Sequence, residues 1–306
     1  MIVCENVVKK FGGFPALDNI SLSIEKGSIY GLVGSNGAGK STLMRCIAGI
    51  YCPDSGKLEV GGEKVYENPS VKQKILMVAD EPWFVQQADM RLMKQFYKRF
   101  YPDFSDEIYE ELIHAFALPE RKRISNFSKG MKRQAAFLFG MACRPDWIML
   151  DECFDGLDPV KRQIVKKVVC DAVADRQMTA VISSHNLKEM DELCDTVGLL
   201  HKGRLLYSRD LDSLKGEVHK IEVVFEETVD KDKLAHVLPV LAMEVKGRFF
   251  TLIARGTMEE VEEKLSCFKP LAVEAIPLTL EEVFLYEMKV QGYDAEVLFA
   301  DGTEEK

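Results

Sequence analysis

One glycine-rich segment constrains the fold of this 306-residue chain more than any other feature. An apolar run at residues 29–33 precedes the segment as a buried strand, and residues 42–50 follow as a helix. Between a strand and a helix, such a loop wraps its backbone N–H groups around phosphate. A flexible glycine turn is the alternative, and these flanking elements argue against it. The segment fits G-x-x-x-x-G-K-[ST] and reads Gly34-Ser35-Asn36-Gly37-Ala38-Gly39-Lys40-Ser41-Thr42.

We therefore predict that residues 34–42 bind the phosphates of ATP. Lys40 is expected to reach the β- and γ-phosphates, and the Ser41 hydroxyl is expected to bind Mg²⁺. Two further acidic residues, Asp151 and Glu152, follow the apolar run at 147–150. Asp151 is expected to hold Mg²⁺ through water, and Glu152 to orient or deprotonate an attacking water. Alone, this pair fits a surface turn equally well, but its place downstream of a phosphate loop favours catalysis.

Short apolar runs alternate with longer amphipathic segments over roughly residues 1–215. This alternation predicts an α/β fold with a largely parallel sheet. Residues 82–142 are rich in helix formers, with helical spacing at 91–101 and 106–116, and predict a mostly helical insertion. Gly203 is expected in a hairpin turn. The runs that read as strands are residues 3–7, 20–24, 29–33, 75–78, 148–150, 180–182 and 197–200.

The pattern changes after Gly216. Strand-like runs and helical segments follow in the order βαββαβ, which predicts a small ferredoxin-like α+β domain over residues 216–290. A closing helix is expected at 280–288, and residues 291–306 are expected to form an acidic, frayed tail. The strands are expected at 220–225, 242–245, 249–254 and 273–276, and the helices at 230–237 and 257–265.

The bulk composition disfavours several classes of protein. No apolar stretch approaches the length of about 18 residues needed to cross a bilayer, and the N-terminus lacks the pattern of a secretory signal. We therefore expect a cytoplasmic protein. The net charge of −9 disfavours nucleic acid as a partner. The eight cysteines form no CxxC pair, so we expect buried free thiols rather than a zinc site.

These motifs and their order resemble the nucleotide-binding subunits of ABC transporters, a branch of the P-loop NTPases, over residues 1–215. The resemblance implies that residues 127–131, Phe-Ser-Lys-Gly-Met, correspond to the family's signature Leu-Ser-Gly-Gly-Gln. Ser128, Lys129 and Gly130 would then contact ATP held by another subunit, in a head-to-tail homodimer or heterodimer. Ser128 is also a natural N-cap, so an ordinary capped helix is the alternative for this stretch alone.

The resemblance assigns roles to three more residues. Asp158, in residues 154–159, corresponds to the D-loop that touches the opposite subunit, although the stretch alone also fits a turn. His185 follows a buried strand, as the family's switch histidine does, and would bind the γ-phosphate and the attacking water. Phe11 corresponds to the aromatic residue that stacks on adenine. Phe14 is a weaker candidate, and a core position is the alternative for both phenylalanines.

Two positions depart from the family pattern. Asp80 stands where the family has glutamine, and its carboxylate is a further candidate ligand of Mg²⁺. Cys153 stands where the family usually has proline. We expect it to be a small buried residue, and the alternative is that its thiol, beside Glu152, makes the enzyme sensitive to oxidation. A basic run contains Arg121, Lys122, Arg123, Lys129, Lys132 and Arg133. Its first three residues read as a solvated face, with contact to anionic lipid as the alternative.

The wording Ser-Lys-Gly-Met is similar to the branch whose permeases are of the ABC-2 type. It implies an ATP-hydrolysing subunit, on the inner face of the cell membrane, that powers a separate permease exporting peptide, antibiotic or lipid. The permease is expected to dock around residues 80–104, and the C-terminal domain to support dimerisation or structure. The alternative is an ABC protein acting on nucleic acid or ribosomes, which the single phosphate loop and acidic charge disfavour. A binding module without hydrolysis is disfavoured by Glu152 and His185.

Overall fold

The computed structural model describes residues 1–226 and 229–290, so the predicted tail lies outside the described residues. The chain divides into two compact units. Among the described residues, the first unit contains residues 1–186 and 193–208, and the second contains residues 187–192, 209–226 and 229–290. The short segment 187–192 therefore groups with the C-terminal unit, although it lies within the predicted N-terminal region.

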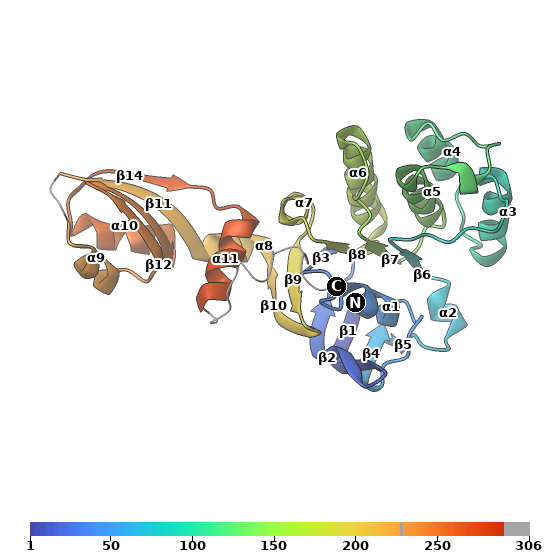
Figure 1. Cartoon of the computed structure of the whole chain (residues 1–306), viewed down its shortest axis with the longest axis horizontal. Helices are drawn as coiled ribbons and strands as arrows, with labels where there is room; N and C mark the ends of the chain where they lie inside the picture. Colours follow the sequence, from blue (N-terminus) through green and yellow to red (C-terminus); the bar gives the residue numbers. More distant parts are fainter. Residues whose placement is uncertain (227–228, 291–306) are drawn as a thin grey trace, which may run out of the picture. The chain divides into compact units, whose positions relative to one another are not determined.

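The first unit is built around a six-stranded sheet in the order β10-β9-β3-β8-β7-β6 (Figure 1). The pairs β6–β7, β7–β8, β3–β8 and β3–β9 are parallel, as the sequence predicted. Every residue of β3, β7 and β8 is buried, as expected for parallel strands covered on both faces. The strands are β3 (Ile29–Val33), β6 (Ile75–Val78), β7 (Trp147–Asp151), β8 (Thr179–Ser184), β9 (Thr196–His201) and β10 (Arg204–Asp210).

A second sheet of the first unit is antiparallel and was predicted only in part. Its order is β2-β1-β4-β5. The prediction missed β4, whose buried side chains are confined to Leu58 and Val60. The expected strands at 3–7 and 20–24 are parts of two longer strands joined at Gly12-Gly13. The four strands are β1 (Ile2–Phe11), β2 (Phe14–Ile24), β4 (Ser55–Val60) and β5 (Glu63–Lys64).

Helix α1 (Lys40–Ile47) and the antiparallel sheet lie on one side of the six-stranded sheet, and α5 (Lys129–Ala142) and α6 (Pro159–Arg176) lie on the other (Figure 1). A shared core of buried side chains, including Ile20, Leu43 and Met149, joins α1 to both sheets. This packing fixes the start of α1, and with it the phosphate loop, against the carboxyl edge of the central sheet.

The described residues between β6 and β7 contain helices and no strand, as predicted for the insertion. The aromatic rings of Tyr97 and Phe139 stack at 4.9 Å between α3 and α5. Asp89, Ser105 and Ser128 each cap a helix by accepting a backbone N–H. The helices that accompany α5 here are α3 (Met90–Phe100), α4 (Asp106–Ala115) and a 3₁₀ turn (Ile124–Asn126), while α2 (Pro69–Lys72) precedes β6.

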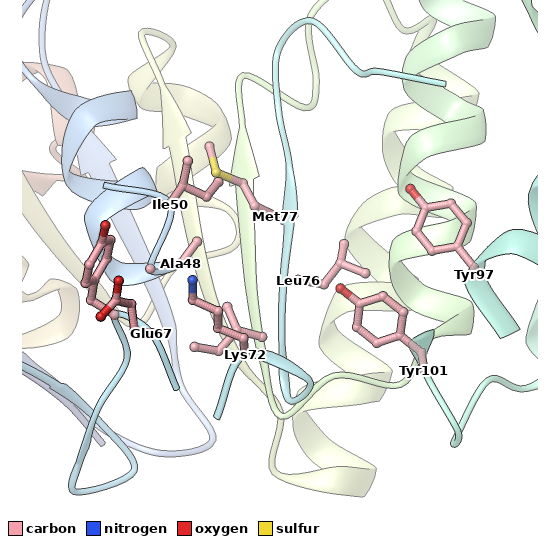
Figure 2. A pocket seen from close by; sticks show the side chains of 11 residues that line it. Ala48, Ile50, Glu67, Lys72, Leu76, Met77, Tyr97 and Tyr101 are labelled. Atoms are coloured by element: carbon pink, nitrogen blue, oxygen red, sulfur yellow. The ribbon is translucent and has the colours of Figure 1, made fainter. Parts of the chain in front are cut away.

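A cavity of about 530 Å³ lies in the first unit beside β6 (Figure 2). Ile50 and Met77 line it on one side, and Tyr97 and Tyr101, at the end of α3, line it on the other. Nearby, Trp83 and Phe100 are 71% and 54% exposed, and both rings contact Phe96. An aromatic cluster of two exposed rings, Trp83 and Phe100, and the half-buried ring of Phe96 therefore belongs to the helical insertion.

The second unit contains a four-stranded antiparallel sheet in the order β12-β13-β11-β14. Its elements follow the predicted βαββαβ order. Ile221, Phe250 and Leu265 belong to its separate apolar core. The elements are α7 (Leu187–Asp191), α8 (Leu211–Glu217), β11 (Val218–Phe225), α9 (Lys231–Val237), β12 (Val240–Lys246), β13 (Phe249–Arg255), α10 (Met258–Ser266), β14 (Pro270–Ile276) and α11 (Leu280–Val290).

Among the described residues, no helix is both long enough and apolar enough to span a bilayer. All eight cysteines are free, but the expectation that they are buried is wrong for Cys52, Cys170 and Cys267, which are exposed. Burial raises the pKa of Cys4 and of Cys46 to about 12, so these thiols are protonated and inert at neutral pH.

Candidate active site

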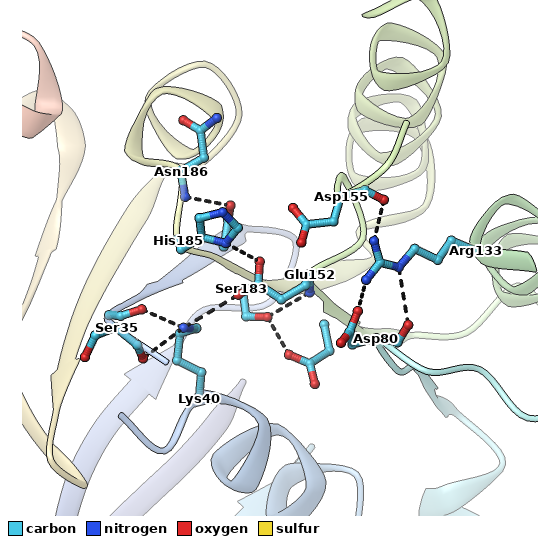
Figure 3. A network of polar contacts seen from close by, with 12 residues as sticks. Ser35, Lys40, Asp80, Arg133, Glu152, Asp155, Ser183, His185 and Asn186 are labelled. Carbon is cyan, nitrogen blue, oxygen red and sulfur yellow. Dashed lines mark hydrogen bonds and ion pairs between the residues drawn. The ribbon is translucent and has the colours of Figure 1, made fainter. Parts of the chain in front are cut away.

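The phosphate loop is held open by glycines whose backbones have positive φ. Gly39 has φ +107°, and a Cβ there would lie 2.7 Å from the carbonyl oxygen of Ala16. Gly39 also caps α1 without a side-chain hydrogen bond, so no side chain competes for the first N–H groups of the helix. Lys40 is buried, and its Nζ donates to the carbonyl oxygens of Gly34 at 2.6 Å and Ser35 at 3.3 Å (Figure 3). The ammonium group is thereby directed back into the loop.

Asp151 ends β7 beside Ser183 of β8, because the parallel register pairs these two residues. Ser183 Oγ donates to Asp151 Oδ1 at 2.6 Å and accepts the backbone N–H of Glu152 at 3.0 Å. Asp151 is 1% exposed, and its Oδ2 has no hydrogen-bond partner among the described residues. A buried carboxylate oxygen without a donor is costly. This oxygen fits a divalent cation or a water bound to one, such as Mg²⁺.

Glu152 lies between a lysine and a histidine (Figure 3). Its backbone has φ +47°, the left-handed region, which turns the chain sharply where β7 ends. Its Oε1 lies 3.6 Å from Lys40 Nζ, and its Oε2 lies 3.0 Å from His185 Nδ1. The Asp155 carboxylate belongs to the same group, since ligand atoms of Glu152, Asp155 and His185 lie within 4.8 Å of one another. This arrangement suits a general base that accepts a proton from a water molecule near a phosphate.

Arg133 is a buried arginine to which sequence reasoning assigned no individual role. It is 5% exposed on α5, and its Nη2 forms an ion pair with Asp80 Oδ1. Its Nε donates to the Asp80 carbonyl oxygen at 3.3 Å, and its Nη1 donates to the carbonyl oxygen of Asp155 (Figure 3). The Asp80 carboxylate is thus already paired with the Arg133 side chain. Its role as a ligand of Mg²⁺ remains a prediction. The run at 121–123 is exposed, as expected of a solvated face.

The signature segment begins α5. Ser128 caps the helix by accepting the Met131 N–H at 3.2 Å, as predicted, and both Ser128 and Lys129 are exposed. A Cβ on Gly130 would lie 2.7 Å from the carbonyl oxygen of Gly156, so the helix approaches the loop after β7 closely. The exposed Ser128 and Lys129 are accessible to a ligand on another subunit.

Asp158 caps α6 by accepting the N–H of Lys161 at 3.0 Å. That hydrogen bond lowers the pKa of the Asp158 carboxyl below its usual value, so it is ionised at neutral pH. Its neighbour Val160 is 70% exposed. An exposed carboxylate and an exposed apolar side chain at the start of α6 suit contact with a second protein chain.

Phe11 and Phe14 flank the hairpin turn between β1 and β2. They are 43% and 69% exposed, so the alternative of a core position is wrong for both. Tyr51 packs its edge against Phe11 at 5.3 Å between ring centroids, and Lys9 Nζ lies 5.5 Å from the Phe11 ring. The contact with Tyr51 therefore holds the Phe11 ring in place, and the exposed part of the ring can stack on a base.

The structure brings residues 34–42, Asp151, Glu152 and His185 together at the carboxyl edge of β3, β7 and β8. Sequence reasoning assigned no role to Ser183, Asp155 or Arg133. Because parallel strands end at the same edge of a sheet, the serine directly after the apolar run at 180–182 could have been predicted to lie near Asp151. Cys153 is 5% exposed, in agreement with a small buried residue.

Comparisons with known proteins agree with this geometry. The family model described as "ABC transporter" matches residues 17–155. The chain is similar to the ABC transporter ATP-binding protein YtrB of Bacillus subtilis (strain 168), with 34% identity over 93% of this chain and 97% of the relative. It is 29% identical to the bacitracin transport ATP-binding protein BcrA of Bacillus licheniformis, over 70% of this chain and 71% of the relative.

A solved structure, of an ATP-binding subunit of an ABC transporter, superposes with a TM-score of 0.65. It covers 70% of this chain and 92% of that structure, at 22% sequence identity, and so supports the fold.

Proposed function

The chain belongs to the ABC transporter family as an ATP-binding, ATP-hydrolysing subunit, and from this premise we propose how its site works and what it drives. The relatives favour this activity over an ABC protein that acts on nucleic acid or ribosomes. The observation that carries the proposed mechanism is the position of Glu152, within reach of both Lys40 and His185.

The N–H groups of residues 34–42, the start of α1 and Lys40 bind the phosphates, and Phe11 stacks on adenine. Ser41 and Asp151 hold Mg²⁺, with Ser183 fixing the orientation of the Asp151 carboxylate. When bound, Mg²⁺ neutralises charge on the β- and γ-phosphate oxygens. Asp80 supplies a further oxygen only if its ion pair with Arg133 opens.

Glu152 accepts or orients the proton of the attacking water, and His185 positions Glu152 through the contact at 3.0 Å. Lys40 holds Glu152 through the ion pair at 3.6 Å and also binds the γ-phosphate. Binding of a phosphate to Lys40 therefore weakens its hold on Glu152. When ATP is bound, the Glu152 carboxylate is therefore released from Lys40 and is available to accept a proton from water.

We propose that two such subunits pair head to tail around two ATP molecules. The exposed residues Ser128 and Lys129 of one subunit, with Gly130, face the ATP of the other, and Asp158 contacts the opposite subunit. Lys129 adds positive charge near a triphosphate, which favours this contact. The partner is a second copy of this chain or a related ATPase subunit.

The membrane partner is a permease of the ABC-2 type, which docks on the helical insertion. The cavity beside β6, which is lined by polar as well as apolar side chains, and the aromatic cluster of Trp83, Phe96 and Phe100 offer a surface for one of its cytoplasmic helices (Figure 2). Docking there places the subunit at the cytoplasmic face of the cell membrane. The bacitracin transport relative makes export of a peptide, an antibiotic or a lipid the cargo class we propose.

Residues 1–215 form the nucleotide-binding domain, and residues 216–290 form an accessory domain that supports the dimer. The second unit has its own apolar core, which favours a domain with a role of its own. Among the described residues of this unit, no group of three or more His, Cys, Asp or Glu side chains is placed to hold a metal ion.

The test compares wild type with Glu152→Gln in the presence of Mg-ATP, measuring phosphate release and molecular mass by light scattering. Wild type is expected to hydrolyse ATP, and the variant to lose activity by about 10²- to 10⁴-fold while forming an ATP-dependent dimer. A Glu152→Gln chain that still hydrolyses ATP at the wild-type rate would overturn the assignment of the base. An inactive variant that stays monomeric with ATP would argue against pairing of identical subunits.

A further inference from the structure

Arg133 joins three segments that are distant in the sequence. It lies on α5, one turn after the signature residue Gly130, and contacts Asp80 after β6 and Asp155 after β7. All three nitrogen atoms of the planar guanidinium have a partner: Nη2 and Nε bind Asp80, and Nη1 binds Asp155. Lysine cannot reproduce such a set of contacts, because its ammonium group lacks the rigid fork.

The contact with Asp155 matters because of the segment in which Asp155 lies. Residues 152–158 form two successive tight turns, with hydrogen bonds from Asp155 N to Glu152 O and from Leu157 N to Phe154 O. Two residues of this loop have positive φ, Glu152 at +47° and Gly156 at +71°. A loop of this kind needs support from outside to hold one conformation.

Helix α5 supplies that support at two points one turn apart. Gly130 packs against Gly156 so closely that a Cβ would lie 2.7 Å from its carbonyl oxygen. Arg133 then binds the carbonyl oxygen of the preceding residue, Asp155. The Asp155 carboxylate faces Glu152 and His185, within the group that spans 4.8 Å.

Asp80 completes the arrangement. A buried guanidinium is tolerated only with a compensating charge, and the Asp80 carboxylate provides it. Asp80 itself is 42% exposed and lies where the chain leaves β6 for the helical insertion. A displacement of this segment relative to α5 would change the partners of Arg133.

We propose that Arg133 is a positioning residue for ATP hydrolysis. It fixes the position of the loop that carries Glu152 by binding the carbonyl oxygen of Asp155. Because it also binds Asp80, a movement of the segment that enters the helical insertion would change the position of this loop. The inference rests on the proposed role of Glu152 as the base. It adds a residue that touches neither phosphate nor metal and yet sets the rate.

The experiment uses the full chain with Mg-ATP, together with its permease if the chain alone turns over slowly. Arg133→Gln is expected to lower kcat by ~10- to 100-fold while the Kd for ATP changes by less than about threefold. Because Asp80 is partly exposed, its carboxylate can be hydrated in this variant, and the fold is retained. Arg133→Lys is expected to recover only part of the rate.

The matched control is Lys132→Gln, which removes the same positive charge one position earlier on α5 and is expected to leave kcat within about twofold. Arg133→Gln with a wild-type rate would overturn the inference. So would equal losses of rate and of ATP affinity in both Arg133 variants, because these indicate a merely structural role. A wild type without hydrolysis counts against the proposed function instead.

Hydrogen exchange decides the inference independently of turnover. In Arg133→Gln, the amides of Asp155 and Leu157 are expected to exchange at least about tenfold faster, whereas those of α1 stay unchanged. Unchanged exchange across residues 152–158 would show that Arg133 does not hold this loop. Adding Asp80→Asn to Arg133→Gln is expected to cause no further loss of activity, because Arg133→Gln has already removed the contact with Asp80.

Discussion

Lys40 Nζ lies 3.6 Å from Glu152 Oε1, so the phosphate-binding lysine and the proposed base form an ion pair. Both side chains are largely shielded, at 6% and 14% exposure, so solvent screens the interaction less than at the surface. The pair makes substrate binding and activation of the base interdependent. ATP must compete with a carboxylate for the lysine.

This competition predicts that Glu152→Gln binds ATP more tightly than wild type. The change removes both a competitor for Lys40 and a negative charge near the γ-phosphate. We expect the Kd for ATP to fall by at least about threefold. Titration with a fluorescent ATP analogue measures it. His185→Gln removes the other partner of Glu152 and should not tighten binding, and equal tightening in both variants would contradict this account.

The orphaned oxygen of Asp151 predicts a specific metal dependence. Asp151→Asn replaces one buried carboxylate oxygen with an amide nitrogen and removes a charge. We expect the Mg²⁺ concentration that gives half-maximal ATPase activity to rise by about 10- to 100-fold. Asp146→Asn, at the exposed residue directly before the same strand, is the control. An unchanged Mg²⁺ requirement in Asp151→Asn would remove Asp151 from the metal site.

Gly39 and Gly216 form a second matched pair. A methyl group at Gly39 would lie 2.7 Å from the carbonyl oxygen of Ala16, and it would make the φ of +107° at this position unfavourable. A methyl group at Gly216, within α8, would meet no atom within 4 Å. Gly39→Ala should lose about 1–3 kcal/mol of stability and weaken ATP binding at least tenfold. Gly216→Ala should gain up to about 1 kcal/mol. Urea titration with and without ATP measures both, and similar losses in the two variants would refute the reasoning.

Much of the first unit could be predicted because its central strands are continuous apolar runs. The run at 29–33 ends at the phosphate loop, and the run at 147–150 ends at Asp151, so strand ends and site residues coincide. The antiparallel sheet was less accessible. Strand β4 is half exposed and contains the charged residues Lys57 and Glu59, and it becomes a strand through its pairing with β1 and β5.

The site could be predicted where a motif is local in sequence and not where it depends on tertiary contacts. Residues 34–42 and the pair at 151–152 are contiguous. The bond from Ser183 to Asp151 follows only from the order of β7 and β8 in the sheet. Arg133 belongs to a basic run in the sequence, and nothing local distinguishes it from the half-buried Lys132. Its burial follows from the packing of α5 beside the loops after β6 and β7.

The last prediction concerns Glu282, which holds α11 in the second unit. Its Oε1 lies 2.7 Å from Lys220 Nζ on β11, and its Oε2 accepts the N–H of Thr279 at 3.0 Å. Burial alone would raise the pKa of Glu282, but the hydrogen bonds from Lys220 and Thr279 outweigh it and hold the pKa below 4.5. A carboxyl with a depressed pKa stabilises the fold above its unfolded value, and this stabilisation is lost as pH falls through the folded pKa.

Glu282→Gln should therefore destabilise the second unit by about 1 kcal/mol at pH 7, as expected for the loss of a charged helix-capping contact. The difference from wild type should shrink once the pH falls well below 4.5, since wild-type Glu282 is then protonated as well. Lys220, whose pKa the same ion pair raises above 10.5, adds no loss in this range because it stays charged. Calorimetry at neutral and acidic pH, with the exposed neighbour Glu281→Gln as control, measures the effect. A deficit of equal size at both pH values would show that Glu282 acts through packing and not through its charge.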